Sequence, residues 1–162
     1  MLKIFVDADA CPVKEEIYRV ARRYDLEVVL VTGMRMRSPE HGKVTLKTVS
    51  QGMNAADDWI AEHVGPDDIV ITADIPLVAR SLAKGACVIG NTGRPFTEEN
   101  IGQAMATRAL LSELRETGEL VGGPPPFRKQ DRSRFLQELD KVITQIRRRS
   151  VETRKENFKG GN

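Results

Sequence analysis

The chain has 162 residues, of which 40% are hydrophobic and 30% charged, so it is long enough for one globular domain with a substantial core. This composition excludes a fibre and a disulfide-stapled miniprotein. No apolar run reaches the ~20 residues that span a bilayer, and no signal-peptide pattern follows Met1. We therefore expect a soluble, cytoplasmic protein with no membrane partner. The net charge of +2 is uneven, because residues 1–126 carry 14 basic against 18 acidic side chains and residues 127–162 carry 11 against 5.

Short apolar runs alternate with helical patterns through residue 90. Runs typical of strands cover residues 2–6, 26–31, 44–49, 69–72 and 86–89. Apolar residues recur at helical spacing within 13–24, 54–64 and 76–84. This alternation predicts an α/β fold, with a parallel five-stranded sheet in the order 3-2-1-4-5 and helices on both faces.

The remainder of the chain has helical patterns. Thr97 is expected to cap a long helix that ends at Gly118, and the apolar face of this helix is a candidate homodimer contact. After a Gly- and Pro-rich link at 122–126, Asp131 is expected to cap a last helix, with Arg147–Arg149 at its end favouring the helix dipole. Apolar periodicity stops at Ser150, so we predict one domain over residues 1–149 and a basic, disordered tail over 150–162.

Acidic residues cluster where the predicted strands end. Asp7 and Asp9 follow the first strand, Asp74 follows the fourth, and Asp57 lies on the helix after the third, on the same face as Asn54. Ligands of an open parallel sheet bind outside the carboxyl ends of its strands, so these side chains are expected to share one crevice.

Carboxylates gathered in one low-dielectric site repel one another unless a cation joins them. Oxygen ligands without histidine favour Mg²⁺ or Mn²⁺, which assist phosphoryl transfer by activating water. The predicted catalytic and metal-binding residues are therefore Asp7, Asp9, Asp57 and Asp74, with Asn54 as a possible uncharged ligand.

Simpler structural roles exist for each acid. Asp9 could cap the first helix, Asp57 could belong to a solvated helix edge, and Asp74 could hold a turn. The combination favours a shared metal site over these separate roles. The two histidines, His41 and His63, are too few for a histidine-rich zinc site or a two-histidine ribonuclease mechanism, and the two cysteines are far apart, as expected of buried thiols.

Candidate phosphate-binding residues lie outside the acidic segments. Thr92 and Arg94 precede the Thr97 helix, where backbone N–H groups can accept an anion. Arg128 and Arg132 lie at the start of the last helix and could follow a nucleic-acid backbone. Aromatic residues make up only 5% of the chain, which argues against an extensive base-stacking platform.

Several motifs together resemble the bacterial YaiI/YqxD family, a group of uncharacterised proteins placed near the PIN-like nucleases. The resemblance runs from residue 1 to about residue 147 and is carried by Val6-Asp7-Ala8-Asp9-Ala10-Cys11-Pro12, Ala55-Ala56-Asp57, Ile71-Thr72-Ala73-Asp74-Ile75-Pro76-Leu77, Gly123-Pro124 and Asp131-Arg132-Ser133. It implies a PIN-like three-layer α/β fold with a metal-dependent nuclease-type centre at Asp7, Asp9, Asp57 and Asp74. The family pattern usually has Asp where this chain has Asn54, which removes one charge from the site.

Three functions are compatible with these features. The first is an Mg²⁺- or Mn²⁺-dependent nuclease that cleaves RNA or single-stranded nucleic acid. The second is a phosphatase of the haloacid dehalogenase type, since Asp7-Ala8-Asp9 follows a strand, although the later lysine and acidic pair of that pattern are not evident. The third is a non-catalytic module that binds RNA, a nucleotide or a protein through a degraded acidic site, a hypothesis that Asn54 favours.

Overall fold

The computed structural model describes residues 2–37, 39–40, 42–121 and 126–160. His41 and most of the predicted Gly- and Pro-rich link therefore lie outside the described residues. Cys11 is a buried free thiol, and Cys87 is a half-buried one.

A mostly parallel sheet forms the centre of the fold. Its strands are β1 (Lys3–Asp7), β2 (Glu27–Thr32), β3 (Val44–Thr48), β4 (Ile69–Ile71), β5 (Cys87–Ile89) and β6 (Pro95–Phe96). They lie in the order β3-β2-β1-β4-β5-β6, and only β6 is antiparallel to its neighbour. The predicted order of the first five strands is confirmed. The sixth strand was not predicted, because two residues are too few to produce a hydrophobic period.

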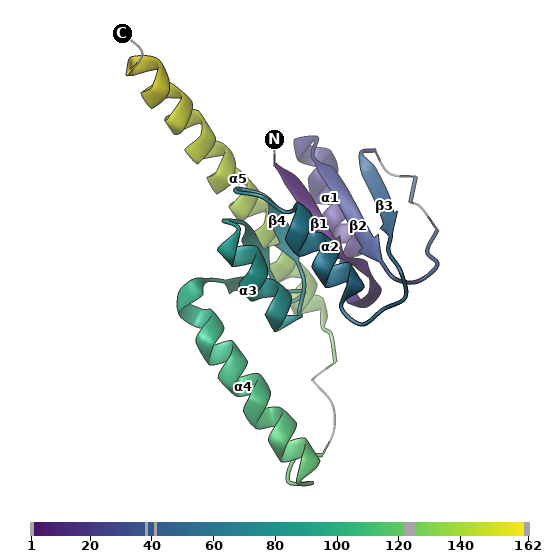
Figure 1. The fold of residues 1–162 in the computed structure, drawn as a ribbon. Helices are drawn as coiled ribbons and strands as arrows, with labels where there is room; N and C mark the ends of the chain where they lie inside the picture. The colour runs from purple at the N-terminus through teal and green to yellow at the C-terminus, as the bar shows by residue number, and fades with distance from the viewer. Residues whose placement is uncertain (1, 38, 41, 122–125, 161–162) are drawn as a thin grey trace.

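Helices cover both faces of this sheet (Figure 1). One face is covered by α1 (Lys14–Tyr24) and α5 (Lys129–Lys159), and the other by α2 (Ala55–His63), α3 (Ile75–Ala83) and α4 (Glu98–Glu116). Along the described residues, no helix combines the length and apolar composition that crossing a bilayer requires.

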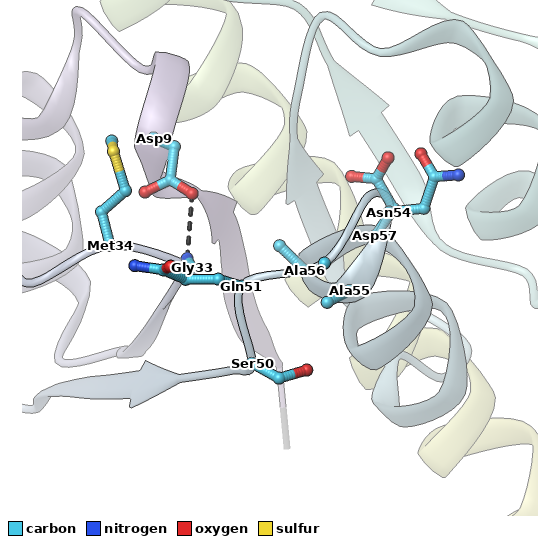
Figure 2. Close-up of a pocket in the computed structure, with 10 residues that line it drawn as sticks. Asp9, Gly33, Met34, Ser50, Gln51, Asn54, Ala55, Ala56 and Asp57 are labelled. Atoms are coloured by element: carbon cyan, nitrogen blue, oxygen red, sulfur yellow. Dashed lines mark hydrogen bonds between the residues drawn. The ribbon is translucent and has the colours of Figure 1, made fainter.

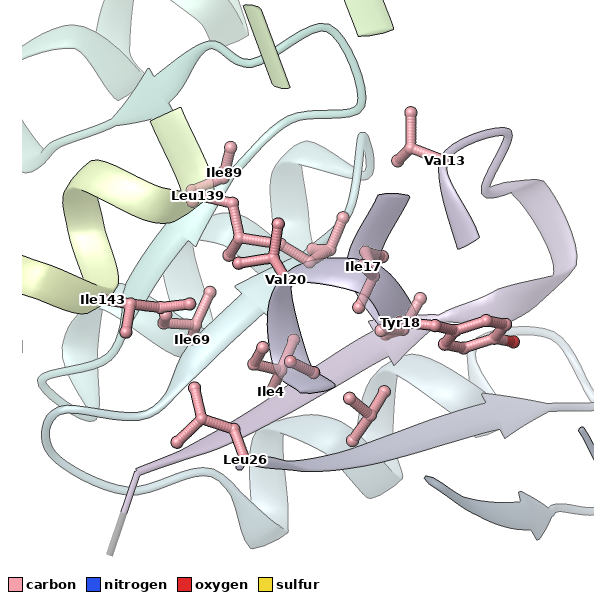
Figure 3. Close-up of a cluster of buried hydrophobic side chains, with 14 of the residues drawn as sticks. Ile4, Val13, Ile17, Tyr18, Val20, Leu26, Ile69, Ile89, Leu139 and Ile143 are labelled. Atoms are coloured by element: carbon pink, nitrogen blue, oxygen red, sulfur yellow. The ribbon is translucent and has the colours of Figure 1, made fainter. Parts of the chain in front are cut away.

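Two hydrophobic clusters hold these layers together. In β1, Ile4 and Val6 belong to the cluster that includes α1 and α5, whereas Phe5 belongs to the cluster with α2 and α3. Figure 3 shows the first cluster, in which Ile143 of α5 lies beside Ile69 of β4. Because alternate residues of the central strands are buried on opposite faces, these strands appear in the sequence as continuous apolar runs.

The ends of α4 agree with the sequence prediction. The Thr97 hydroxyl accepts a hydrogen bond from the Asn100 N–H at 3.2 Å, and the Asn100 side chain accepts one from the Thr97 N–H at 2.9 Å. Gly118, at a φ of +78°, follows the helix. Along α4 itself, Met105 and Leu110 remain 51% and 55% exposed, and the homodimer contact stays a prediction.

The last helix differs from the prediction at both ends. Its N-cap residue is Arg128, and Asp131 instead accepts the Arg128 N–H from the first turn at 2.9 Å. The helix continues past Ser150 to Lys159, and residues 151–160 are all exposed. Arg147–Arg149 therefore lie within the helix and not at its C-terminal dipole; Arg147, for example, lies over the Tyr24 ring. The domain boundary at residue 149 and the disordered tail stay predictions.

Candidate functional site

The end of β1 is fixed by a buried threonine on the neighbouring strand. Thr72 directly follows β4, which pairs with β1 in parallel, and its side chain is 1% exposed. Its hydroxyl donates to the Asp7 carboxylate at 3.3 Å and accepts from the Asp74 N–H at 3.0 Å. One side chain thus sets the position of two predicted site residues relative to each other.

A second buried threonine, on the other side of β1, holds Asp9 in place. Thr32 ends β2, and its hydroxyl donates to Asp9 and accepts from the Met34 N–H at 3.0 Å. The Gly33 N–H donates to the other Asp9 oxygen at 2.9 Å. Asp9 lies in a short 3-10 turn, Ala8–Ala10, and α1 has Val13 as its N-cap residue, so the helix-capping role considered for Asp9 is wrong.

Asp57 and Asp74 are brought together by the starts of two helices. Asp57 lies in the first turn of α2, and Asp74 is the N-cap residue of α3, where its side chain forms no capping hydrogen bond. The two carboxyl groups are close enough to share a hydrogen bond when one of them is protonated. Burial, this hydrogen bond and the charges of Asp74 and Asp7 raise the pKa of Asp57 to about 7.

Asp7 completes this group of carboxyls. Burial, and then the negative charges of Asp9 and Asp74, raise the pKa of Asp7, while the Thr72 hydrogen bond opposes the change. Three half-buried acids from β1, α2 and the start of α3 therefore repel one another at the carboxyl edge of the sheet. In the absence of a cation, a proton held by Asp57 relieves part of this repulsion.

A cavity of ≈370 Å³ opens beside the acids. Figure 2 shows Asp9, bonded to Gly33, on one side of it and Asn54 with Asp57 on the other. Asn54 is exposed, has a φ of +68°, and forms no side-chain cap on α2. Asn54 therefore lines the cavity as an exposed side chain without a capping role.

The four predicted acids do not form a complete coordination shell. Within the described ranges, no three His, Cys, Asp or Glu side chains are grouped closely enough to hold a metal ion. The donor chemistry nevertheless fits a hard divalent cation, because Asp7, Asp57 and Asp74 supply only oxygen and interact through unfavourable negative charge. Asp9 is already engaged by Thr32 and Gly33 and is the least available of the four.

A profile of the family described as "Uncharacterized BCR, YaiI/YqxD family" matches residues 5–145. The chain belongs to the YaiI/YqxD family. Similar proteins include UPF0178 protein BRADO3147 of Bradyrhizobium sp. (strain ORS 278), 53% identical with 91% of this chain and 90% of the relative covered. UPF0178 protein RC1_2062 of Rhodospirillum centenum is 56% identical, with 91% and 99% covered. No solved structure matches the chain.

The turn that carries Thr92 and Arg94 in this YaiI/YqxD protein lies between the acidic segment and α5. The Asn91 side chain donates to the Ala10 carbonyl at 3.1 Å, beside Asp9. On the other side, a Cβ added at Gly93 would lie 2.6 Å from the Arg134 carbonyl carbon. Thr92 and Arg94 are both exposed at this turn, so the structure leaves their side chains accessible to a phosphate.

In this YaiI/YqxD protein, the other two candidate phosphate-binding residues, Arg128 and Arg132, differ in their contacts with the fold. Arg132 donates to the Pro12 carbonyl at 2.8 Å, pairs with Glu16 at 3.2 Å, and lies over the Phe127 ring. These contacts join α5 to the start of α1 and give Arg132 a structural role. The Arg128 side chain is exposed and keeps its proposed role.

Sequence reasoning missed the two threonines that position the acids. Among the described residues, the buried polar ones are Thr32, Thr72 and Ser81. A signal was present, since each threonine hydroxyl comes at the end of an apolar run and immediately precedes a loop. A hydroxyl buried at that position needs a hydrogen-bond partner, and the end of a neighbouring strand can supply one.

The raised pKa of Asp57 predicts a pH-dependent stability. The folded protein keeps a proton on Asp57 up to about pH 7, whereas in the unfolded chain the Asp57 carboxyl has its ordinary pKa of 3.8. The free energy of unfolding in EDTA should therefore fall as pH rises between these values and level off above them. Asp57→Asn, whose amide can donate to Asp74 as the protonated acid does, should remove the part of this decrease that Asp57 causes and be the more stable protein at pH 8.

Urea unfolding at pH 5 and pH 8 measures this difference. Asp67→Asn is the matched control, because Asp67 is exposed, precedes β4 at the opposite end of the sheet, and has a positive φ that Asn tolerates. Equal pH dependence in wild type and Asp57→Asn would show that Asp57 ionises normally.

Proposed function

We propose that this protein is an Mg²⁺- or Mn²⁺-dependent nuclease with a PIN-like fold, which hydrolyses phosphodiester bonds in RNA or single-stranded nucleic acid. The observation that supports it best is the contact between Asp57 and Asp74 beside Asp7, where burial and negative charge hold the pKa of Asp57 at about 7. Carboxyls crowded in this way destabilise the ion-free protein, and a divalent cation removes the repulsion.

Asp7, Asp57 and Asp74 would hold the cation. When bound, it would neutralise charge on the scissile phosphate and activate a water molecule. Thr72 positions Asp7 and the Asp74 backbone relative to each other, while Asp9, through Thr32 and Gly33, fixes the loop after β2 at the edge of the cavity. Asn54 offers a neutral oxygen on the same side of the cavity as Asp57.

Cleavage assays with purified protein test this proposal. Labelled RNA, single-stranded DNA and duplexes of the same sequence are incubated with Mn²⁺, with Mg²⁺, and with EDTA. We expect products from single-stranded substrates only when a metal is present. Binding of these oligonucleotides without product under any metal would contradict the nuclease and favour the non-catalytic binding module.

A further inference from the structure

Another cavity, of ≈560 Å³, is lined by the two chain neighbours of Asp74 and by one face of α4. The two neighbours are Ala73 and Ile75, so the cavity lies next to the segment that carries Asp74. In Figure 1, α4 starts beside α3 and then extends away from the sheet. The cavity is therefore a groove that lies between the segment that carries Asp74 and the face of α4.

Three arginines line this groove. They are Arg94, from the turn before β6, and Arg108 and Arg115, from α4. All three are exposed, and in the part of the chain that the structure describes none of them forms an ion pair. Residues 1–126 contain four more acidic than basic side chains, so three unpaired guanidiniums in one groove are not explained by the average charge of this region.

The two arginines of α4 belong to one stripe of the helix. Arg108, Leu111 and Arg115 are separated by three and four residues, which places them on the same face. At 1.5 Å per residue, the two arginine positions are about 10 Å apart along the helix. Positive charge is thus distributed along the groove, as an extended polyanion requires, rather than concentrated at one point.

The floor between these charges is apolar. Ile75, Phe96 and Leu111 line it, and the Arg94 guanidinium lies 5.6 Å from the centre of the Phe96 ring. In a duplex the base faces are covered by stacking, whereas in a single strand they are free to pack on apolar side chains or on guanidinium planes. The combination of apolar floor and arginines therefore favours a single strand over a duplex.

We propose that this groove binds the part of a single-stranded nucleic acid that flanks the scissile phosphate, with Arg94, Arg108 and Arg115 contacting its phosphates. This inference rests on the proposed nuclease function for the position of the cleaved bond. The binding itself requires neither metal nor cleavage, so the two proposals can be tested separately.

Fluorescence anisotropy of a labelled 12-nucleotide oligouridylate, in EDTA and with Asp7→Asn as the background, measures binding without turnover. Adding Arg108→Ala and Arg115→Ala should raise the Kd at least tenfold and reduce the slope of log K against log salt by about 1.4, since each lost phosphate contact removes about 0.7. Both positions are exposed on a helix, where alanine is well tolerated, and thermal unfolding verifies the fold.

The matched control removes two positive charges elsewhere. Arg19→Ala with Lys84→Ala changes exposed helix or helix-end positions outside the groove and should leave the Kd within about twofold of the background. No binding by the background protein, an equal loss in the control, or an unchanged Kd in the groove variant would overturn the proposal. Displacement of the oligonucleotide by a lower concentration of polyglutamate would also overturn it, in favour of an acidic protein partner.

Cleavage by the wild-type protein separates the two proposals. A groove variant that loses binding, together with a wild type that cleaves nothing, would support the groove and contradict the nuclease. Normal cleavage by the wild type, together with unchanged binding in the groove variant, would support the nuclease and contradict the groove.

Discussion

Asp7→Asn should abolish metal-dependent cleavage while leaving the protein folded. The charges of Asp9 and Asp74 both act on Asp7, and the negative charge of Asp7 is part of what a cation would neutralise. A metal ion contributes several kcal/mol of charge stabilisation to phosphoryl transfer, so its loss corresponds to a rate decrease of roughly 10²- to 10⁴-fold. Single-turnover cleavage of the best substrate, at saturating Mn²⁺, measures this decrease.

Folding of the Asp7→Asn variant is expected to be normal. The Asn carbonyl oxygen can still accept the Thr72 hydroxyl, and one source of repulsion is removed. Asp67→Asn makes the same chemical change at the other end of the sheet and should cleave at the wild-type rate. Comparable rates for wild type and Asp7→Asn would exclude Asp7 from the reaction.

Gly93→Ala should be among the most destabilising single substitutions outside the core. Gly93 has a φ of +85°, and a Cβ there would lie 2.6 Å from the carbonyl carbon of Arg134 and 2.7 Å from its oxygen. Those atoms belong to the backbone of α5 and cannot move like a flexible side chain. We expect the free energy of unfolding to fall by roughly 3 kcal/mol or more, from backbone strain and steric overlap together.

Gly118→Ala separates these two causes. Gly118 also has a positive φ, of +78°, but no atom lies within 4 Å of the added Cβ. It should therefore cost only the strain of the left-handed conformation, about 1–2 kcal/mol. Urea unfolding of both variants gives the comparison, and equal destabilisation would show that the turn does not pack on α5 as described.

Local sequence signals were sufficient for most of the architecture. The continuous apolar runs predicted a sheet covered on both faces, and Thr97 with Gly118 marked both ends of α4. Strand β6 and the continuation of α5 past Ser150 were missed for opposite reasons. β6 is defined by pairing with β5 and not by its own sequence, while the exposed end of α5 has no apolar face from which a helix could be predicted.

The pairing of β1 with β4 was predictable from the sequence, and it explains why Asp7 and Asp74 lie near each other. Asp57 comes from the first turn of α2, and the role of these acids as a functional site stays a prediction. The engagement of Asp9 by Thr32 depends on a contact between residues 23 positions apart, which no periodicity indicates. The groove role of the α4 arginines could not be predicted from the sequence either, because the groove forms only where α3 and β6 lie opposite them.

Calorimetric titration of Mn²⁺ into the wild-type protein at pH 8, with Asp7→Asn and Asp67→Asn alongside, tests the central claim most directly. Since Asp57 is mostly ionised above its pKa of about 7, the carboxyls are then free to bind a cation. The account predicts saturable binding by wild type and Asp67→Asn that is lost or greatly weakened in Asp7→Asn. Absence of binding in the wild type, or equal binding in all three proteins, would contradict a metal site at these carboxyls.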